Sequence, residues 1–248
     1  MDKNKVVLIT GASRGIGRAI ALHFASKGYD VAFTYYEHKE LATQVRDHIV
    51  AMGRKCLVMQ CDIALERDVL RVRDEFNEHF DHLDVLVNNA GIAIDSLFQE
   101  KTVENFTRTM EVNVLGTFLM SKYFGEMMFD ARKGCIVNIS STNGINTYFP
   151  MCVDYDASKA GVNSLTHNLA MQFAPYVNVN AVAPGFIATQ SEIGDMSEEF
   201  INSEVNKIIK RRIGTEQDVA NLVYFLSTPE ADFINSEIIR IDGGQYGA

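Results

Sequence analysis

The chain has 248 residues, of which 47% are hydrophobic and 22% charged, and its formal net charge is -9 at pH 7. This length and composition are typical of a folded protein with a sizeable core, either one large α/β domain or two small ones, and they exclude a disordered chain. The acidic balance argues against broad binding to nucleic acid or to anionic membranes, because both need a basic surface.

Targeting and metal-binding signals are not evident in the sequence. No segment approaches the ~18 continuous apolar residues of a membrane span, and the polar start does not resemble a signal peptide. The cysteines have none of the paired spacings of a zinc or redox motif, so we expect no metal site. We expect reduced thiols in a cytoplasmic protein rather than disulfides at Cys56, Cys61, Cys135 and Cys152.

An apolar run and a glycine-rich turn open the chain. The run from Val6 to Ile9 is typical of a strand buried on both faces. It leads into Thr10-Gly11-Ala12-Ser13-Arg14-Gly15-Ile16-Gly17, after which Ile20 and Phe24 continue at helical spacing. Glycines allow a tight turn and close approach of a ligand, and a helix N-terminus attracts a pyrophosphate. This order predicts a dinucleotide site, with an ordinary strand-to-helix turn as the alternative.

The glycine spacing also indicates a family. Gly-x-x-x-Gly-x-Gly differs from the Gly-x-Gly-x-x-Gly of most dinucleotide-binding dehydrogenases and resembles the coenzyme loop of the short-chain dehydrogenase/reductase family. In that family the loop holds a nicotinamide dinucleotide at the carboxyl ends of a parallel sheet. The resemblance implies coenzyme contacts from Gly11, Ser13, Arg14, Ile16 and Gly17.

The end of the second expected strand, Val31 to Thr34, bears on the choice of coenzyme. Enzymes that use NAD place a carboxylate about 20 residues beyond the glycines to bind the ribose 2′-hydroxyl. Tyr35 occupies that position here. With Arg14 as a candidate partner for a 2′-phosphate, we expect NADP(H). Glu37 keeps NAD(H) open, because two residues of loop could bring its carboxylate near the ribose.

Two further strand-and-helix units follow. The first expected helix has its apolar face at Leu41, Val45, Ile49 and Met52 and ends at Gly53, and the strand Leu57 to Met59 follows it. The second expected helix has its apolar face at Val69, Val72, Phe76 and Phe80 and is followed by the strand Val85 to Val87. In the family, an Asp after the third strand hydrogen-bonds the adenine and the next residue lies against its ring. The resemblance assigns these roles to Asp62 and Ile63, with capping of the next helix as an alternative for Asp62.

Asn88-Asn89-Ala90-Gly91 looks like a family segment that steadies the sheet and backs the coenzyme, which implies coenzyme contacts from Asn89, Ala90 and Gly91. The following helical stretch, Thr102 to Met128, carries Asn113 and Gly116 in its interior. Both are unfavourable there, and glycine costs roughly 1 kcal/mol relative to alanine. In the family this Asn kinks the helix and orders a water that links to a lysine. A tolerated polar residue is the alternative.

A serine pair and a Tyr-x-x-x-Lys pattern carry the expected chemistry. The strand Cys135 to Ile139 ends at Ser140-Ser141, and open parallel sheets bind ligands at the carboxyl ends of their strands. Tyr155 and Lys159 lie four residues apart, on one face of an expected helix. We expect the ammonium to lower the pKa of the phenol from its usual value of about 10, so that it can act as a general acid or base.

The resemblance assigns roles to these residues. Ser141, not Ser140, aligns with the serine that holds the substrate carbonyl. The catalytic set is then Asn113, Ser141, Tyr155 and Lys159, with Tyr155 and Lys159 also contacting the coenzyme. The apolar residues that continue this helix are expected in the core or at a subunit interface: Val162, Leu165, Leu169 and Phe173.

The last part of the chain adds a second coenzyme segment and a lid. A strand through Val179 to Val182 leads to a family-like Pro-Gly segment that implies coenzyme contacts from Pro184, Gly185, Ile187 and Thr189. The segment at about 189–212 suggests a substrate lid with a weakly amphipathic helix through Phe200, Ile201, Val205, Ile208 and Ile209. A helix through Val219 to Leu226 and a strand from Ile238 to Ile241 complete the chain.

These elements predict a Rossmann-like, doubly wound α/β sandwich with a central parallel sheet, as one domain over residues 1–248. The resemblance implies an NADP(H)-dependent oxidoreductase acting on a ketone or secondary alcohol, with Tyr155 as general acid/base, in a homo-oligomer such as a dimer or homotetramer. Within the family, the resemblance is greatest to the 3-oxoacyl-acyl-carrier-protein reductases. Arg132 matches one of their carrier-binding basic residues, whereas Tyr176 replaces the other. Alternatives are a small-ketone, sugar or steroid reductase, and a non-catalytic NADP(H)-binding sensor.

Overall fold

A computed structural model describes residues 4–146, 149–188, 193–194 and 196–245. Seven strands form one sheet in the order β3-β2-β1-β4-β5-β6-β7, and every neighbouring pair is parallel. The predicted Rossmann-like α/β sandwich is therefore confirmed. The strands are β1 (Val6–Ile9), β2 (Asp30–Tyr35), β3 (Cys56–Gln60), β4 (Val85–Asn88), β5 (Gly134–Ile139), β6 (Val177–Pro184) and β7 (Ile238–Ile241).

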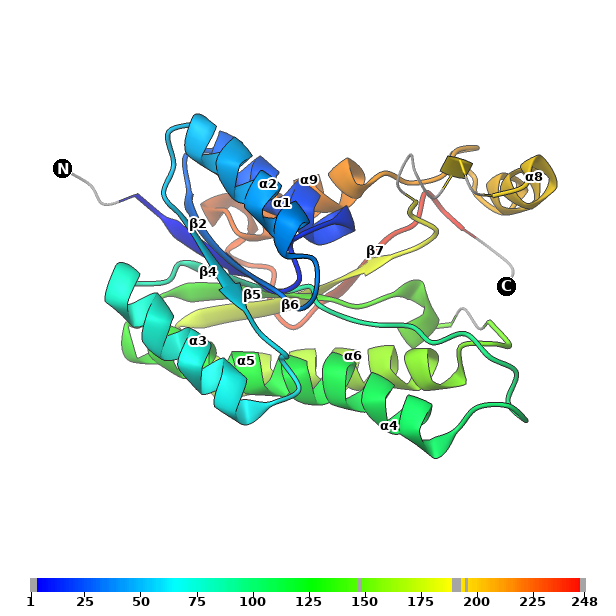
Figure 1. Cartoon of the computed structure of the whole chain (residues 1–248), viewed down its shortest axis with the longest axis horizontal. Helices are drawn as coiled ribbons and strands as arrows, with labels where there is room; N and C mark the ends of the chain where they lie inside the picture. The colour runs from blue at the N-terminus through cyan, green and yellow to red at the C-terminus, as the bar shows by residue number, and fades with distance from the viewer. Residues whose placement is uncertain (1–3, 147–148, 189–192, 195, 246–248) are drawn as a thin grey trace.

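Helices cover both faces of this sheet (Figure 1). One face carries α1 (Gly15–Ser26), α2 (Lys39–Ala51) and α9 (Glu216–Leu226), and the other carries α3 (Glu66–His79), α4 (Val103–Met110), α5 (Gly116–Asp130) and α6 (Val153–Phe173). The helix α8 (Glu198–Asn206) lies at one end of the molecule (Figure 1). Within the described part of the chain, no helix is both long and apolar enough to span a bilayer.

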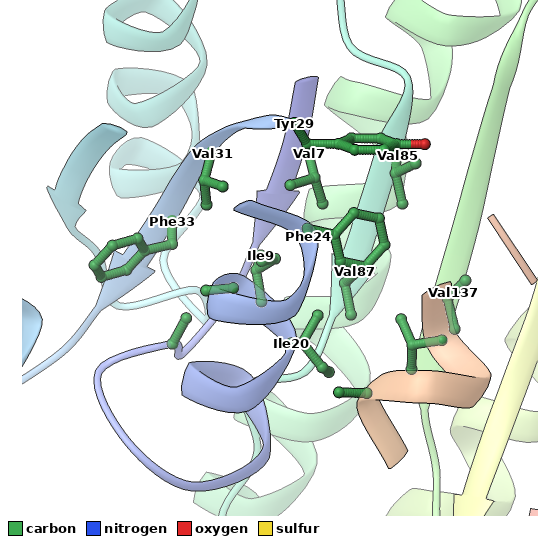
Figure 2. Close-up of a cluster of buried hydrophobic side chains, with 14 of the residues drawn as sticks. Val7, Ile9, Ile20, Phe24, Tyr29, Val31, Phe33, Val85, Val87 and Val137 are labelled. Atoms are coloured by element: carbon green, nitrogen blue, oxygen red, sulfur yellow. The ribbon is translucent and has the colours of Figure 1, made fainter. Parts of the chain in front are cut away.

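The core explains why the strands read as continuous apolar runs. All four residues of β1 are buried, because helices cover both faces of the sheet. On the α1 face, Ile20 and Phe24 of that helix pack onto Val7 and Ile9 of β1 (Figure 2). A second cluster fills the α3, α5 and α6 face. The alternation of strand and helix along the chain therefore places every strand end at a predictable edge of the sheet.

The long expected helix is interrupted by a π-helical turn, η1 (Glu111–Leu115), which joins α4 to α5. Asn113 lies in this turn, so the helix distortion predicted from the sequence is present. Gly116 follows it, and a Cβ added there would lie 2.6 Å from the side chain of Ile63. The close packing of Ile63 on the helix explains the glycine, since any larger residue would push the two elements apart.

The helix expected to run through Ile209 is shorter than predicted. α8 ends at Asn206, and Ile208 forms an isolated bridge with Gln245 instead. Ile208 is buried in this position, because its methyl group packs where a Cβ of Gly243 would come within 2.8 Å. Contact with the end of the chain therefore overrides the helical periodicity. Residues 189–192 and 195 of the expected lid lie outside the described residues.

The strand order places a crevice beside β1. β1 pairs with β2 on one side and with β4 on the other, so the chain reverses its direction of winding between them. In open α/β sheets, ligands bind at the carboxyl ends of the strands at this reversal. The glycine-rich turn after β1 and the Asn-Asn-Ala-Gly segment after β4 both emerge there.

Candidate active site

The glycine-rich turn after β1 is fastened to the end of β4. The Thr10 hydroxyl accepts hydrogen bonds from the backbone amides of Asn89 and Ala90, each 2.9 Å long. The Asn89 side chain donates back to the carbonyls of Thr10 and Gly11 at 2.9 and 3.0 Å. Gly11 and Gly15 have φ values of +66° and +55°, which favour glycine. The turn is therefore held in one conformation by a neighbouring strand end.

This turn fits a dinucleotide phosphate. A Cβ on Gly17 would lie 2.4 Å from the carbonyl oxygen of Gly11, so no side chain can enter there. α1 begins at Gly15 directly behind the turn. No side chain among the described residues caps that helix start, and its first turn holds no acidic residue. Its free backbone amides are thus available to an anion.

A cleft of 520 Å³ opens over the turn. It is lined by most of the predicted coenzyme residues, namely Gly11, Ser13, Arg14, Ile16, Gly17, Tyr35, Asp62, Ile63, Asn89, Ala90, Gly91 and Ile187. Thr189, also predicted, lies outside the described residues. The structure thus brings together, in one cleft, segments that follow β1, β2, β3, β4 and β6.

Pro184 and Gly185, which the sequence also assigned to the coenzyme, are not among the residues that line this cleft. Pro184 is the last residue of β6 and is buried. A Cβ on Gly185 would lie 2.5 Å from the Cβ of Asp242. These two residues therefore pack against the segment after β7, and Ile187 is the residue of this loop that reaches the cleft.

The cleft also contains residues that sequence reasoning did not assign to the coenzyme: Gly15, Thr34, Tyr36, His38, Cys61, Ile92, Arg108, Val112 and Glu216. Arg108 of α4 donates to Asp62 Oδ2 at 2.8 Å, and its guanidinium lies 5.9 Å from the centre of the Tyr36 ring. The other oxygen of Asp62 accepts from the Ala64 amide, while α3 is capped at Leu65. Asp62 is thus an ion-pair partner and not a helix cap. No sequence spacing predicts that Arg108 reaches the cleft, because it comes from a helix that is distant in the sequence.

The serine pair divides into two roles. Ser140 Oγ donates to Asn163 Oδ1 at 2.6 Å and is buried against α6. Ser141 Oγ instead accepts from the Asn143 amide at 3.2 Å, and the Ser141 side chain lies close enough to the phenol to lower the pKa of Tyr155. The structure therefore places Ser141, and not Ser140, beside the phenol.

Lys159 stands behind Tyr155. Its Nζ lies 5.5 Å from the centre of the Tyr155 ring and donates to the Ile139 carbonyl at 2.8 Å. Only 4% of Lys159 is exposed. This burial lowers the pKa of Lys159 to about 8.

The expected effect of Lys159 on Tyr155 is wrong for this structure. Burial raises the pKa of the Tyr155 phenol to about 12, and the neighbouring Ser141 only partly opposes this shift. Asp156 and Asp95 raise the same pKa further. The loss of water around the phenol therefore has a larger effect on its pKa than the nearby lysine, whose own ammonium is buried. Tyr155 is held as the neutral, proton-bearing acid.

Asn113 ties the π-helical turn to the strand end that borders the cleft. Its Oδ1 accepts from the Ile92 amide at 2.8 Å, and its Nδ2 donates to the Ile92 carbonyl and to Ser158 Oγ, each at 2.9 Å. A Cβ on Gly91 would lie 3.2 Å from Asn113 Oδ1 and 3.3 Å from Lys159 Nζ. Asn113 and Lys159 thus converge on Gly91, a residue of the cleft wall.

Arg132, matched by alignment to a carrier-binding residue, lies elsewhere. It follows α5 immediately before β5, so it is at the amino ends of the strands. There its guanidinium lies 5.3 Å from the centre of the Tyr176 ring. Within one chain, Arg132 therefore lies at the amino ends of the strands, whereas Tyr155 lies toward their carboxyl ends.

Comparisons with known proteins agree with this arrangement. Residues 11–245 match a family described as Enoyl-(Acyl carrier protein) reductase. The chain is 38% identical to the 3-oxoacyl-[acyl-carrier-protein] reductase FabG of Staphylococcus aureus (strain N315) over 99% of this chain and 100% of that protein. It is 34% identical to the glucose 1-dehydrogenase 2 of Bacillus subtilis (strain 168), covering 97% of this chain and 94% of that one.

Among solved structures, the acetoin dehydrogenase from Enterobacter cloacae superposes with a TM-score of 0.89 at 30% identity, covering 98% of this chain and 96% of that chain. The two relatives and the solved structure match over nearly the full length of each protein. Together with the cleft after β1 and the Ser141–Tyr155–Lys159 cluster, they show that this chain belongs to the short-chain dehydrogenase/reductase family, as an oxidoreductase acting on CH–OH groups.

Proposed function

We propose that this protein is an NADP(H)-dependent oxidoreductase that interconverts a ketone and a secondary alcohol. The observation that carries the proposal is the meeting point at Gly91. This residue lines the cleft, and a Cβ on it would lie 3.3 Å from Lys159 Nζ. Lys159 Nζ in turn lies 5.5 Å from the centre of the Tyr155 ring, and Ser141 is close enough to influence the pKa of that phenol. Coenzyme cleft and proton donor therefore adjoin each other.

The chemistry divides between coenzyme and protein. The nicotinamide coenzyme supplies or accepts the hydride when bound. Tyr155, neutral in this structure, gives its proton to the substrate oxygen during reduction, and Ser141 donates a hydrogen bond to the same oxygen. These fixed donors stabilise the negative charge that develops there. In alcohol oxidation Tyr155 must first release its own proton to solvent, after which the phenolate accepts the proton of the alcohol, and Ser141 holds the oxygen. Lys159 and Asn113 hold this group against the cleft wall.

NADP(H) is supported by the residues at the ribose end of the cleft. Tyr35 ends β2 where NAD-dependent enzymes have a carboxylate. The Arg14 side chain is exposed at the cleft and forms no ion pair with any residue that the structure describes. A free guanidinium there favours a 2′-phosphate. NAD(H) is the alternative coenzyme, supported by Glu37, which also lines the cleft.

The substrate class is a ketone or secondary alcohol, in line with the names of the relatives. A 3-oxoacyl-[acyl-carrier-protein] remains the alternative substrate because of the FabG match, although Arg132 and Tyr176 lie far along the sheet from Tyr155. We also propose that the segment at about 189–212 acts as a substrate lid. In support of this, Phe200 of α8 packs edge-on against Phe186, next to the cleft residue Ile187.

We further propose that residues 1–248 act as one domain in a cytoplasmic homo-oligomer, a dimer or tetramer. Support comes from apolar side chains that α5 and α6 expose, among them Phe118 and Met171. Burial of such residues in a subunit interface would remove apolar surface from water.

The test is NADPH oxidation against a panel containing acetoin, a cyclic diketone and a 3-oxobutyryl thioester, with glucose and NADP⁺ for the reverse direction. We expect turnover of at least one compound, and we expect Tyr155→Phe to lower kcat by about 10² to 10⁴ while NADPH still binds. Tight NADPH binding without turnover of any compound would instead support the non-catalytic sensor.

A further inference from the structure

The loop that follows the cleft, residues 92–101, is docked onto the start of α6. Its first residue, Ile92, is held on both backbone groups by Asn113. In its middle, the Ser96 amide donates to the Met151 carbonyl at 3.1 Å. Beside it, Cys152 Sγ donates to Asp95 Oδ1 at 3.1 Å. The loop therefore lies against the residues that immediately precede Tyr155.

A buried ion pair closes the far end of this contact. Lys101 Nζ lies 2.9 Å from Asp154 Oδ1, and the two side chains are 4% and 0% exposed. The same Nζ donates to the carbonyl of Ile94 within the loop. Thr109 of α4 donates to Asp154 Oδ2 at 2.8 Å. Oδ2 thus accepts a hydrogen bond from α4, whereas Oδ1 has the loop ammonium as its ion-pair partner and no hydrogen bond from the residues that the structure describes.

The charged form of Asp154 is maintained by these partners. Burial alone would raise its pKa, but the bonds from Lys101 and Thr109 outweigh burial and leave the pKa lowered. Ion pairs this deeply buried add little net stability over apolar residues of the same size, because both charges lose their water. The pair does fix how the loop lies against α6, because the ammonium must remain at one place relative to both the carboxylate and the Ile94 carbonyl.

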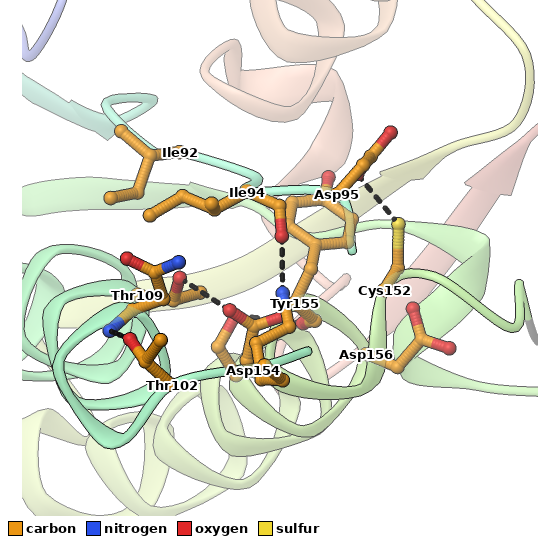
Figure 3. A network of polar contacts seen from close by, with 12 residues as sticks. Ile92, Ile94, Asp95, Thr102, Thr109, Cys152, Asp154, Tyr155 and Asp156 are labelled. Carbon is orange, nitrogen blue, oxygen red and sulfur yellow. Dashed lines mark hydrogen bonds and ion pairs between the residues drawn. The ribbon is translucent and has the colours of Figure 1, made fainter. Parts of the chain in front are cut away.

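We propose that Lys101 and Asp154 are positioning residues that hold the 92–101 loop and Tyr155 in fixed register. This inference rests on the function proposed above. Neighbouring residues on a helix point in different directions, so Asp154 anchors α6 on the α4 side while Tyr155 is free to face the substrate. Figure 3 shows Asp154 directed at Thr109, with the Asp95–Cys152 contact near Tyr155.

The expected consequence is catalytic. A displacement of about 1 Å at a reacting group costs on the order of 100-fold in rate. The coenzyme cleft contains neither Lys101 nor Asp154, so its affinity should be independent of them. A loss in kcat without a loss in coenzyme binding is therefore the signature of this role.

The test is a double-mutant cycle with Lys101→Met, Asp154→Asn and the two together. Each single variant leaves one buried charge without its counter-charge, and we expect kcat to fall by about 100-fold. The double variant also lacks the directional contact, and we expect its kcat to stay about 100-fold below wild type rather than to fall by the product of the two single losses. The dissociation constant for NADPH should change by less than about twofold in all three. The exposed Lys122, paired with Glu66 at 3.7 Å, supplies the control variant Lys122→Met, which should change neither quantity.

A second readout does not depend on catalysis. Cys152 is 7% exposed and contacts the loop residue Asp95, so loop detachment should uncover it. We expect the rate of Cys152 alkylation by iodoacetamide, located by peptide mass spectrometry, to rise about tenfold or more in each single variant. It should be raised to a similar extent in the double variant. All rates are measured at a temperature at which circular dichroism shows every variant folded.

The proposal would be overturned by single variants that keep wild-type kcat and Cys152 reactivity, or by a double variant whose kcat recovers to the wild-type value or falls by the product of the two single losses. If wild-type protein reduces no carbonyl, the proposed function fails. The Cys152 measurement then still decides whether the ion pair holds the loop against α6.

Discussion

The two ionisable side chains at the centre of the site are shifted by the same cause. Burial raises the pKa of Tyr155 to about 12 and lowers that of Lys159 to about 8, so both shifts favour the neutral form. The Tyr-x-x-x-Lys spacing correctly placed the two residues on one helical face. It could not indicate how much water the fold removes from them, which depends on β5 and on the loop before α6. The tyrosine is consequently a proton donor in the structure, not a phenolate.

At this scale the first prediction concerns Lys159 and pH. Its pKa is about 8 when folded and 10.5 ordinarily, so between these values the unfolded chain binds the additional proton. Stability contributed by this residue should therefore rise from pH 8 to 10.5, by about 3 kcal/mol in total. The wild-type melting temperature minus that of Lys159→Met should increase between pH 7 and pH 10. Lys39→Met, which removes an exposed lysine, is the control. A difference that stays constant or shrinks would contradict the assigned shift.

Among the secondary-structure elements, periodicity located every strand and nearly every helix, because most strands are largely buried and most helices bury one face. The π-helical turn at Asn113 and the early end of α8 are different. Asn113 bonds to Ile92, and Ile208 pairs with Gln245. Both features depend on contacts with distant residues, which a local pattern does not contain. The family resemblance nevertheless indicated that the helix is distorted at Asn113.

The second prediction tests this turn. Asn113→Ala would leave the Ile92 amide, the Ile92 carbonyl and Ser158 Oγ without the partner that each has now. An unsatisfied buried group costs about 1–3 kcal/mol, so we expect the free energy of unfolding to fall by about 2–4 kcal/mol in urea titration. Asn168→Ala is the matched control, because Asn168 is exposed and bonds only within its own helix. Equal losses in the two variants would show that the Asn113 contacts do not support the fold.

At the scale of the whole molecule, the parallel sheet gathers strand ends that are far apart in the sequence. The cleft residues after β1, β3, β4 and β6 could be predicted because each follows a recognisable strand. Arg108 and Glu216 could not, since they reach the cleft from the helices α4 and α9. Lys101 and Asp154 could not be predicted for a related reason. Charged residues are usually at the surface, and only the fold shows that these two are buried together.

The third prediction follows from the cleft as a whole. A ligand that binds only the folded chain stabilises it by about 2.7 kcal/mol at 100 times its dissociation constant, which corresponds to a rise of about 5–10 °C in melting temperature for a chain of this size. We expect NADPH to give a larger rise than NADH at equal concentration. Arg14→Ala should remove that preference, whereas Arg18→Ala, at an exposed arginine outside the cleft, should retain it. A larger rise with NADH would reverse the coenzyme assignment.

One hydride transfer is proposed to require both the cleft and Tyr155. It is tested most directly by reduction of the best ketone in the panel with NADPH carrying deuterium on the transferred position of C4. We predict an alcohol with one deuterium on the carbinol carbon, formed by wild-type protein and lost in Tyr155→Phe. An alcohol without deuterium, or equal product from the Tyr155→Phe variant, would contradict the account.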